Sequence, residues 1–250
     1  MTKVSPESQL GTAPVTVEDT EEMFWLRQND DLQSKITLGN LLSSQYRYRE
    51  AISIWNKASE DHPSERSLYL RIGAAYLTLF EFEASDNAFE KYIDLGGAES
   101  DILYPLGMSH YLKGEYEKAS GYFERIPPCG DEMLIAVIYW HLLCDIRLGG
   151  ELSFLKHYHS DMDAGHHGAY KLVVSVLAGE KDPDEALSEI TTETGDLDYC
   201  IAGYGLYCIL KSRGIEDTVL MEKILSRKEV WPSVSYLAAW NDKKGFNKNE

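Results

Sequence analysis

The sequence predicts an all-α protein built from about five helical hairpins and closed by a C-terminal capping helix. Apolar residues recur at helical spacing along most of the 250 residues. Three segments repeat with a constant period of 34 residues, and a fixed period of this length is typical of stacked helical units. No stretch shows the sustained apolar–polar alternation that indicates a half-buried strand.

The three repeats align without gaps and begin at Leu38, Ile72 and Leu106. Each has a glycine as its second residue, followed in its second helix by a small residue and then a large aromatic residue. These positions are Gly39, Gly73 and Gly107; Ala51, Ser85 and Ala119; and Trp55, Phe89 and Phe123. A glycine inside a helix costs roughly 1 kcal/mol relative to alanine. We therefore expect each glycine to allow close packing against the aromatic residue of its own hairpin.

This pattern closely resembles the tetratricopeptide-repeat (TPR) family, over roughly residues 32–131. The resemblance implies a right-handed α-solenoid in which the first helices of successive units line a concave face that binds polypeptides. Tyr46 and Phe80 stand where the family usually has a turn glycine. These departures concern the geometry of two turns.

The flanking segments complete the predicted organisation. It consists of a flexible tail (1–17), an N-terminal helix (18–30), three TPR units (31–131), degenerate hairpins with a cap (132–241) and a frayed tail (242–250). The helix 131–148 is apolar nearly all round, as expected of a buried helix, and Gly149 ends it. Shorter helices are expected at about 151–159, 167–178 and 183–191, the last beginning at Asp182-Pro183.

A fifth hairpin is indicated by two apolar stripes that face each other. Their members are Leu197, Cys200, Ile201, Tyr204 and Cys208, and then Val219, Leu220, Ile224 and Leu225. A terminal helix after Trp231-Pro232 caps the stack. The segment from Tyr170 onward also looks weakly similar to the tail of NlpI-type TPR lipoproteins, although no cysteine near Met1 could accept a lipid.

The formal charge of −17 and the pI near 4.8 describe an acidic surface. Such a surface repels nucleic acid and anionic membranes, so we expect a protein or peptide partner of apolar or basic character. Four cysteines, at positions 129, 144, 200 and 208, lack zinc or dithiol spacing. Free, mostly buried thiols are expected, although an even count leaves disulfides open. No secretion signal or bilayer-spanning run is evident, and a cytoplasmic protein is the expectation.

One polar cluster, KHYHSDMDAGHHG, has the donor atoms of a metal site between His157 and His167. Its spacing resembles that of metallo-β-lactamase-like hydrolases, but Met162 takes the place of the last histidine. A calcium loop also fails, because Leu172 stands where the closing glutamate is needed. We expect a solvated loop, with no catalytic residue, no metal and no cofactor. Gly203 and Gly205 lack a preceding strand and indicate close helix packing instead of a dinucleotide loop.

The TPR resemblance implies which residues face the groove. These are Gln33, Ile36, Asn40, Ser43 and Ser44; Ser67, Leu70, Ala74, Leu77 and Thr78; and Asp101, Tyr104, Met108, Tyr111 and Leu112. From this set we predict partner contacts at Asn40, Leu70, Ala74, Leu77, Asp101, Tyr104, Met108 and Tyr111. The third unit is expected to carry an exposed apolar patch of Leu77, Tyr104, Met108 and Tyr111.

An alternative is that the patch is covered by the N-terminal segment around Phe24 and Trp25, or by later helices. Some TPR proteins grip the C-terminus of chaperones with lysines and asparagines, and Asn40 occupies one such position. Ile36 and Asp101 stand where those proteins have cationic residues, which argues against a chaperone-tail receptor.

The sequence thus predicts a non-catalytic adaptor or scaffold that binds a polypeptide on a concave helical face. One alternative is a structural protein that self-associates into a homo-oligomer. Another is a metal-dependent enzyme that uses the cluster from His157 to His167.

Overall fold

The computed structural model describes residues 18–191 and 193–244, and every regular element in these ranges is a helix. The predicted all-α class is therefore confirmed for the described part of the chain. Contacts divide the chain into two compact units, Met1–Pro105 and Leu106–Glu250. The predicted tail 1–17 lies outside the described residues, as do the last six residues of the predicted tail 242–250.

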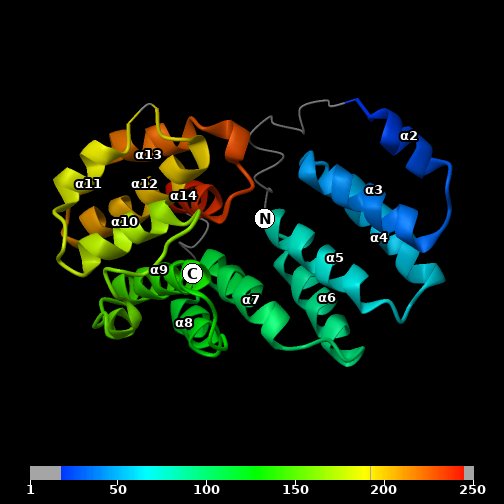
Figure 1. Ribbon diagram of the computed structural model, residues 1–250, viewed down its shortest axis with the longest axis horizontal. Helices are drawn as coiled ribbons and strands as arrows, with labels where there is room; N and C mark the ends of the chain where they lie inside the picture. The colour runs from blue at the N-terminus through cyan, green and yellow to red at the C-terminus, as the bar shows by residue number, and fades with distance from the viewer. Residues whose placement is uncertain (1–17, 192, 245–250) are drawn as a thin grey trace. The chain divides into compact units, whose positions relative to one another are not determined.

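The first unit consists of a short helix followed by two helical hairpins (Figure 1). Helix α2 (Glu21–Arg27) is capped by Thr20, whose hydroxyl accepts a hydrogen bond from the Met23 amide at 3.2 Å. Helices α3 (Leu32–Ser44) and α4 (Tyr48–Asp61) form one hairpin, and α5 (Arg66–Thr78) and α6 (Phe82–Asp94) form the next. Helix α5 also packs against α4, so the two hairpins share one core.

The predicted glycine contact is present in all three repeats. A methyl group added at Gly39 would lie 2.1 Å from Trp55 Nε1, and one at Gly73 would lie 2.6 Å from Phe89 Cε1. The third repeat comprises α7 (Ser100–Lys113), which crosses the boundary between the units, and α8 (Tyr116–Glu124). There a methyl group at Gly107 would lie 2.4 Å from a ring carbon of Phe123. Close packing is thus the physical reason for the three glycines.

The turns inside the hairpins show why the sequence departs from the family at two positions. Tyr46 has φ of 63° and Phe80 has φ of 60°, and Gly114 has φ of 78° at the matching position of the third hairpin. This left-handed conformation is easy for glycine and strained for bulky residues. The chain therefore keeps the turn geometry of the repeat without its glycine.

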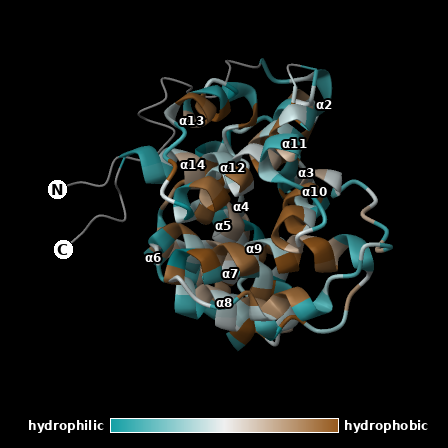
Figure 2. Ribbon diagram, turned by 90° about the vertical axis from the view of Figure 1, so that its left-hand side faces the viewer, coloured by the Kyte–Doolittle hydropathy of each residue, from teal (hydrophilic) through white to brown (hydrophobic). Residues whose placement is uncertain are grey.

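The second unit is built around two long buried helices, α9 (Asp131–Leu148) and α12 (Asp196–Ser212). Helix α9 has the predicted bounds, and Gly149 ends it with φ of 66°. Helices α10 (Gly168–Leu177), α11 (Pro183–Glu189), α13 (Thr218–Leu225) and α14 (Val234–Lys244) pack around them. Brown hydrophobic stretches mark α9 and α10 in Figure 2.

Close-packing glycines recur on α12. A methyl group at Gly205 would lie 2.7 Å from both Tyr139 and Val173, and one at Gly203 would lie 3.1 Å from Ile224. The prediction for these glycines is confirmed. Three of the four cysteines are buried and Cys129 is exposed, and all four are free thiols, as predicted.

Some details of the predicted C-terminal helices are wrong. The expected helix at 151–159 is a short 3₁₀ turn, Ser153–His157, and a second one, Lys228–Val230, was not predicted. Leu197 and Val219 do not belong to the apolar stripes, because they are 48% and 59% exposed at the starts of α12 and α13. The cap helix also continues past residue 241 to Lys244.

A buried polar cluster joins three helices of the second unit. Arg147 of α9 donates hydrogen bonds to the Tyr204 hydroxyl of α12 at 2.8 Å and to the Asp242 carboxylate of α14. Tyr204 also contacts the Tyr111 hydroxyl at 3.0 Å. A buried charge is tolerated only when it is paired in this way. The cluster therefore ties the cap helix to the core.

No helix within the described ranges combines the length and the hydrophobicity needed to cross a bilayer.

Candidate functional site

A hollow with a volume of about 510 Å³ lies between α3, α4 and α5 in the first unit. We call it the α3–α5 hollow. Its lining consists of Asn40, Ser43, Ser44, Tyr46, Tyr48, Trp55, Arg71, Ala74, Ala75 and Thr78. Five of these are groove positions that the TPR resemblance implies: Asn40, Ser43, Ser44, Ala74 and Thr78. The volume falls in the range of ordinary ligand sites.

Two lining residues of the α3–α5 hollow, which belong to different hairpins, are joined by a hydrogen bond. The Nε of Arg71 on α5 donates a 3.0 Å hydrogen bond to the Oδ1 of Asn40 on α3. A second guanidinium nitrogen, Nη1, donates to the Ser67 carbonyl oxygen at 2.7 Å. These bonds hold the planar guanidinium in one orientation. Because Asn40 accepts through Oδ1, the two N–H donors of its amide are left for a ligand.

The hydroxyl groups of the α3–α5 hollow add hydrogen-bonding capacity. Ser44 donates to the Leu41 carbonyl at 2.8 Å, and Thr78 donates to the Ala74 carbonyl at 3.2 Å. With its proton engaged in its own helix, each hydroxyl still offers an oxygen that accepts hydrogen bonds. The hollow therefore presents both donors and acceptors, as a peptide backbone requires.

Two tyrosines form an aromatic wall beside these polar groups. The rings of Tyr46 and Tyr48 are stacked, with centroids 6.4 Å apart and planes 7° apart. Burial raises the pKa of the Tyr48 phenol well above its ordinary value. Below them lies Trp55, which is 2% exposed and whose Nε1 has no hydrogen-bond partner among the described residues.

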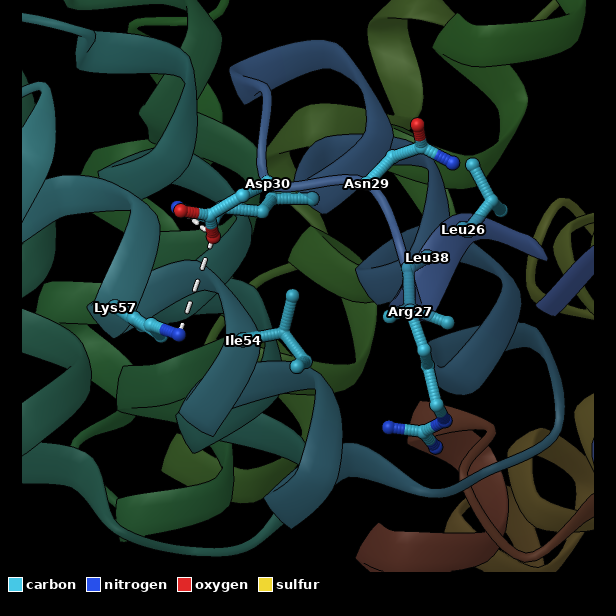
Figure 3. A pocket seen from close by; sticks show the side chains of 8 residues that line it. Leu26, Arg27, Asn29, Asp30, Leu38, Ile54 and Lys57 are labelled. Carbon is cyan, nitrogen blue, oxygen red and sulfur yellow. Dashed lines mark ion pairs between the residues drawn. The ribbon is translucent and has the colours of Figure 1, made fainter. Parts of the chain in front are cut away.

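A second, smaller hollow of about 250 Å³ lies between α2, α3 and α4 (Figure 3). Leu26, Leu38 and Ile54 form its apolar part, and Asp30 and Lys57 lie at its edge.

Charges around this smaller hollow are paired with one another. Lys35 forms ion pairs with Asp61 at 2.8 Å and with Asp30 at 2.9 Å, while Lys57 lies 4.0 Å from Asp30. The pairing raises the pKa of Lys35 and lowers that of Asp61. With its charges already matched, this hollow is best explained as part of the packing of α2.

The predicted apolar patch is not exposed. Leu77 is 6% exposed, and Met108 and Tyr111 are each 2% exposed. For Tyr111 the cause is visible, because its ring packs against Trp140 of α9 at 4.9 Å and against Tyr204 of α12 at 6.4 Å. At Tyr111, later helices thus take the position that we predicted for a partner, as in the alternative noted above.

The other predicted contacts have mixed surroundings. Asn40 and Ala74 are exposed and line the α3–α5 hollow. Leu70 and Tyr104 are half-buried and lie outside that lining. Asp101 is exposed, but its carboxylate accepts a hydrogen bond from the Tyr92 hydroxyl.

The two N-terminal aromatic residues are exposed in the described structure. Phe24 and Trp25 on α2 are 57% and 60% exposed, whereas their neighbours Met23 and Leu26 face inward. These two aromatic side chains are therefore not buried against the rest of the first unit.

Hydrogen bonds that involve backbone groups hold the loop with the histidine cluster in place. Glu132 at the start of α9 accepts a hydrogen bond from the His166 amide at 2.7 Å, and its carbonyl oxygen lies 2.5 Å from His167 Nδ1. Asp163 accepts from the Gly165 amide at 3.0 Å. Among the residues the structure describes, no three His, Cys, Asp or Glu side chains are placed to hold one metal ion. These contacts fasten the loop to α9.

Sequence reasoning missed Arg71, Tyr46 and Tyr48 as lining residues. Arg71 could have been found, since it lies three residues before Ala74 and seven before Thr78 and therefore shares their helix face. From the sequence, Tyr46 is identified only as a residue in an irregular turn. The direction of its side chain depends on its left-handed backbone conformation, which the sequence does not specify.

Comparison with known proteins gives one similar sequence and one similar solved structure. No family model matches the sequence. The chain is 26% identical over 145 residues to protein bimA of Emericella nidulans. The matched region covers 55% of this chain and 17% of the length of bimA. Among solved structures it is similar to YrrB, whose structure is titled as that of a TPR protein with an unusual peptide-binding site. That similarity has a TM-score of 0.46 and 17% identity, and it covers 90% of this chain and 98% of YrrB.

Proposed function

We propose that this chain, whose repeated hairpins have the TPR architecture, is a non-catalytic module that binds a polypeptide in the α3–α5 hollow. The observation that carries the proposal is that five groove positions implied by the repeat meet around one open space lined by both polar and apolar groups. The backbone of an extended segment could form hydrogen bonds with the amide of Asn40 and with the hydroxyl oxygens of Ser44 and Thr78.

Four free thiols favour a reducing compartment such as the cytoplasm.

The test fills the hollow and leaves the fold intact. Ala74 is exposed in the lining, so Ala74→Tyr places a ring in the space that a peptide would occupy. Asn87→Tyr on the exposed face of α6 adds the same ring outside the hollow and serves as the control. Peptides are selected from a random display library on the purified full chain, and their affinity is measured by fluorescence polarisation. We expect Ala74→Tyr to weaken binding at least tenfold and Asn87→Tyr to leave it unchanged. Equal affinity for both variants would rule out this site.

Self-association is the second candidate function, and one observation favours it. Phe24 and Trp25 are adjacent, large and mostly exposed, and exposed aromatic residues are common at protein interfaces. Sedimentation over a hundredfold concentration range tests it. A monomer mass throughout would remove this candidate, whereas a concentration-dependent mass that Trp25→Ser abolishes would support it.

A further inference from the structure

We propose that the α3–α5 hollow recognises a carboxylate group of the bound polypeptide and that Arg71 is the residue that binds it. The inference rests on the proposed function, because it assigns a partner chemistry to the same hollow. It goes further in predicting that the bound segment carries a negative charge at this point.

The charge of the lining is the first argument. Arg71 is the single charged side chain among the ten lining residues, and none of them is a carboxylate. The sign of the charge in this lining is thus opposite to the net charge of −17 of the whole chain. Glu65, at the start of α5, lies outside this lining, and its pKa is lowered chiefly by hydrogen bonds from Ser67 and to a smaller degree by the charge of Arg71. Its oxygen already accepts a hydrogen bond from the Ser67 amide at 3.1 Å, which leaves the cation facing the hollow without a matching anion in the lining.

The orientation of the guanidinium is the second argument. An arginine has five N–H donors, and Asn40 and the Ser67 carbonyl take one each. Three donors remain, including both on Nη2, and no described residue of the chain accepts from them. A guanidinium fixed by two bonds loses little freedom when it binds a carboxylate through a paired N–H···O geometry. The fixed Asn40 amide adds further N–H donors beside it.

The same chemistry could come from an aspartate or glutamate side chain of the partner, or from its C-terminal carboxylate. The site differs from a lysine-based carboxylate clamp, since Ile36 and Asp101 lack the positive charge which that arrangement needs. The acidic surface as a whole favours a basic partner. In this hollow, however, a positively charged group of the partner would be repelled by Arg71. The local charge of the hollow therefore favours a partner that is acidic at this point.

The experiment starts from library peptides whose binding to the full chain is lost in Ala74→Tyr. Each is resynthesised with its acidic residues changed to amides, and separately with an amidated C-terminus. Affinities are measured for the wild type, Arg71→Met, Arg71→Lys and Lys91→Met. Lys91 is exposed on α6, so its change removes one positive charge of the same unit away from the hollow.

We expect neutralising one carboxylate, on a side chain or at the terminus, to weaken binding about tenfold to a hundredfold, as does Arg71→Met. Arg71→Lys should fall between, and Lys91→Met should match the wild type. If the neutralised peptides bind the wild type as tightly as the unchanged peptides do, or if Arg71→Met binds the unchanged peptides as tightly as the wild type does, the carboxylate assignment is overturned and the peptide-binding function still stands. If Ala74→Tyr weakens the binding of none of the selected peptides, both the proposed peptide-binding function and the carboxylate assignment are refuted. The peptide substitutions decide the question even if Arg71→Met is poorly folded.

Discussion

Replacing Gly107 by alanine tests the packing argument on which the fold depends, and Gly121 provides a matched control in the same hairpin. Gly107 lies on α7, and a methyl group there would lie 2.4, 2.7 and 2.8 Å from three ring carbons of Phe123. Gly121 lies on α8, and a methyl group there would have no neighbouring atom within 4 Å. Both sites are helical, so the change in helix propensity is the same and only the contact differs.

The expected magnitudes follow from this geometry. Alanine gains about 1 kcal/mol of helix propensity at either site. Carbon atoms in contact normally lie about 3.5–4.0 Å apart, so the ring of Phe123 must retreat by roughly 1 Å. Phe123 is 1% exposed, and overpacking so tight a site costs about 3 kcal/mol, the upper part of the usual range. We expect Gly107→Ala to destabilise by about 2 kcal/mol and Gly121→Ala to stabilise by about 1 kcal/mol.

The measurement is urea unfolding of the full chain followed by circular dichroism at the helical band. Phe123→Ala provides a further control, because it removes the ring that the new methyl group would meet. In that background Gly107→Ala should stabilise by about 1 kcal/mol, as at Gly121. Equal effects of the two glycine changes, or an unchanged cost of Gly107→Ala without the ring, would refute the packing explanation.

The remaining predictions concern a turn, an ionic network and the buried cluster. Gly114→Ala should lower the free energy of unfolding by about 1 kcal/mol in the same assay, because φ is 78° there; no loss would mean that the turn relaxes. The Asp19 carboxylate bonds to Arg27 and Arg47, which lowers its pKa, so its stabilisation exists above the ordinary carboxyl pKa of about 4 and is lost as the pH falls further. Asp19→Asn should therefore make the melting temperature less sensitive to acid, and an unchanged acid profile would contradict the network. Arg147→Met should cost about 3–5 kcal/mol because Asp242 stays buried without its partner, and adding Asp242→Leu should recover most of the loss; a double variant as unstable as the single one would disprove the pairing.

The regular hairpins could be predicted from the sequence because their signal is local and repeated. A helical glycine and an aromatic residue sixteen positions later specify one contact, and the chain shows it at Gly39 and Trp55, again at Gly73 and Phe89, and once more at Gly107. A cost of about 1 kcal/mol for each glycine needs a compensating contact, so the repeat itself indicated the packing.

Side-chain exposure in the third hairpin could not be predicted in the same way. Tyr111 occupies a groove position of the repeat, but Trp140 and Tyr204 cover it from helices that lie outside the regular period. The family pattern says which face of the first helix a residue occupies. It does not say whether an irregular helix later in the chain packs against that face.

Tyr46 shows how backbone strain bears on the candidate site. A bulky residue with positive φ costs about 1–3 kcal/mol, and both Tyr46 and Phe80 are held there. Phe80 is 7% exposed and its ring packs 5.2 Å from that of Phe82, so burial offsets its strain. Tyr46 is only half-buried and lines the α3–α5 hollow, which gives it less compensation from packing.

Glycine substitutions separate these two explanations. Phe80→Gly should destabilise by about 1–2 kcal/mol, because the lost burial exceeds the relieved strain. Tyr46→Gly should leave the stability unchanged or raise it by up to about 1 kcal/mol, and at the same time weaken the binding of hollow-dependent peptides. Urea unfolding and fluorescence polarisation measure the two effects on the same samples. If Tyr46→Gly instead destabilised as much as Phe80→Gly and left peptide affinity intact, the aromatic wall would be a packing feature. Its strained tyrosine would then have no part in recognition.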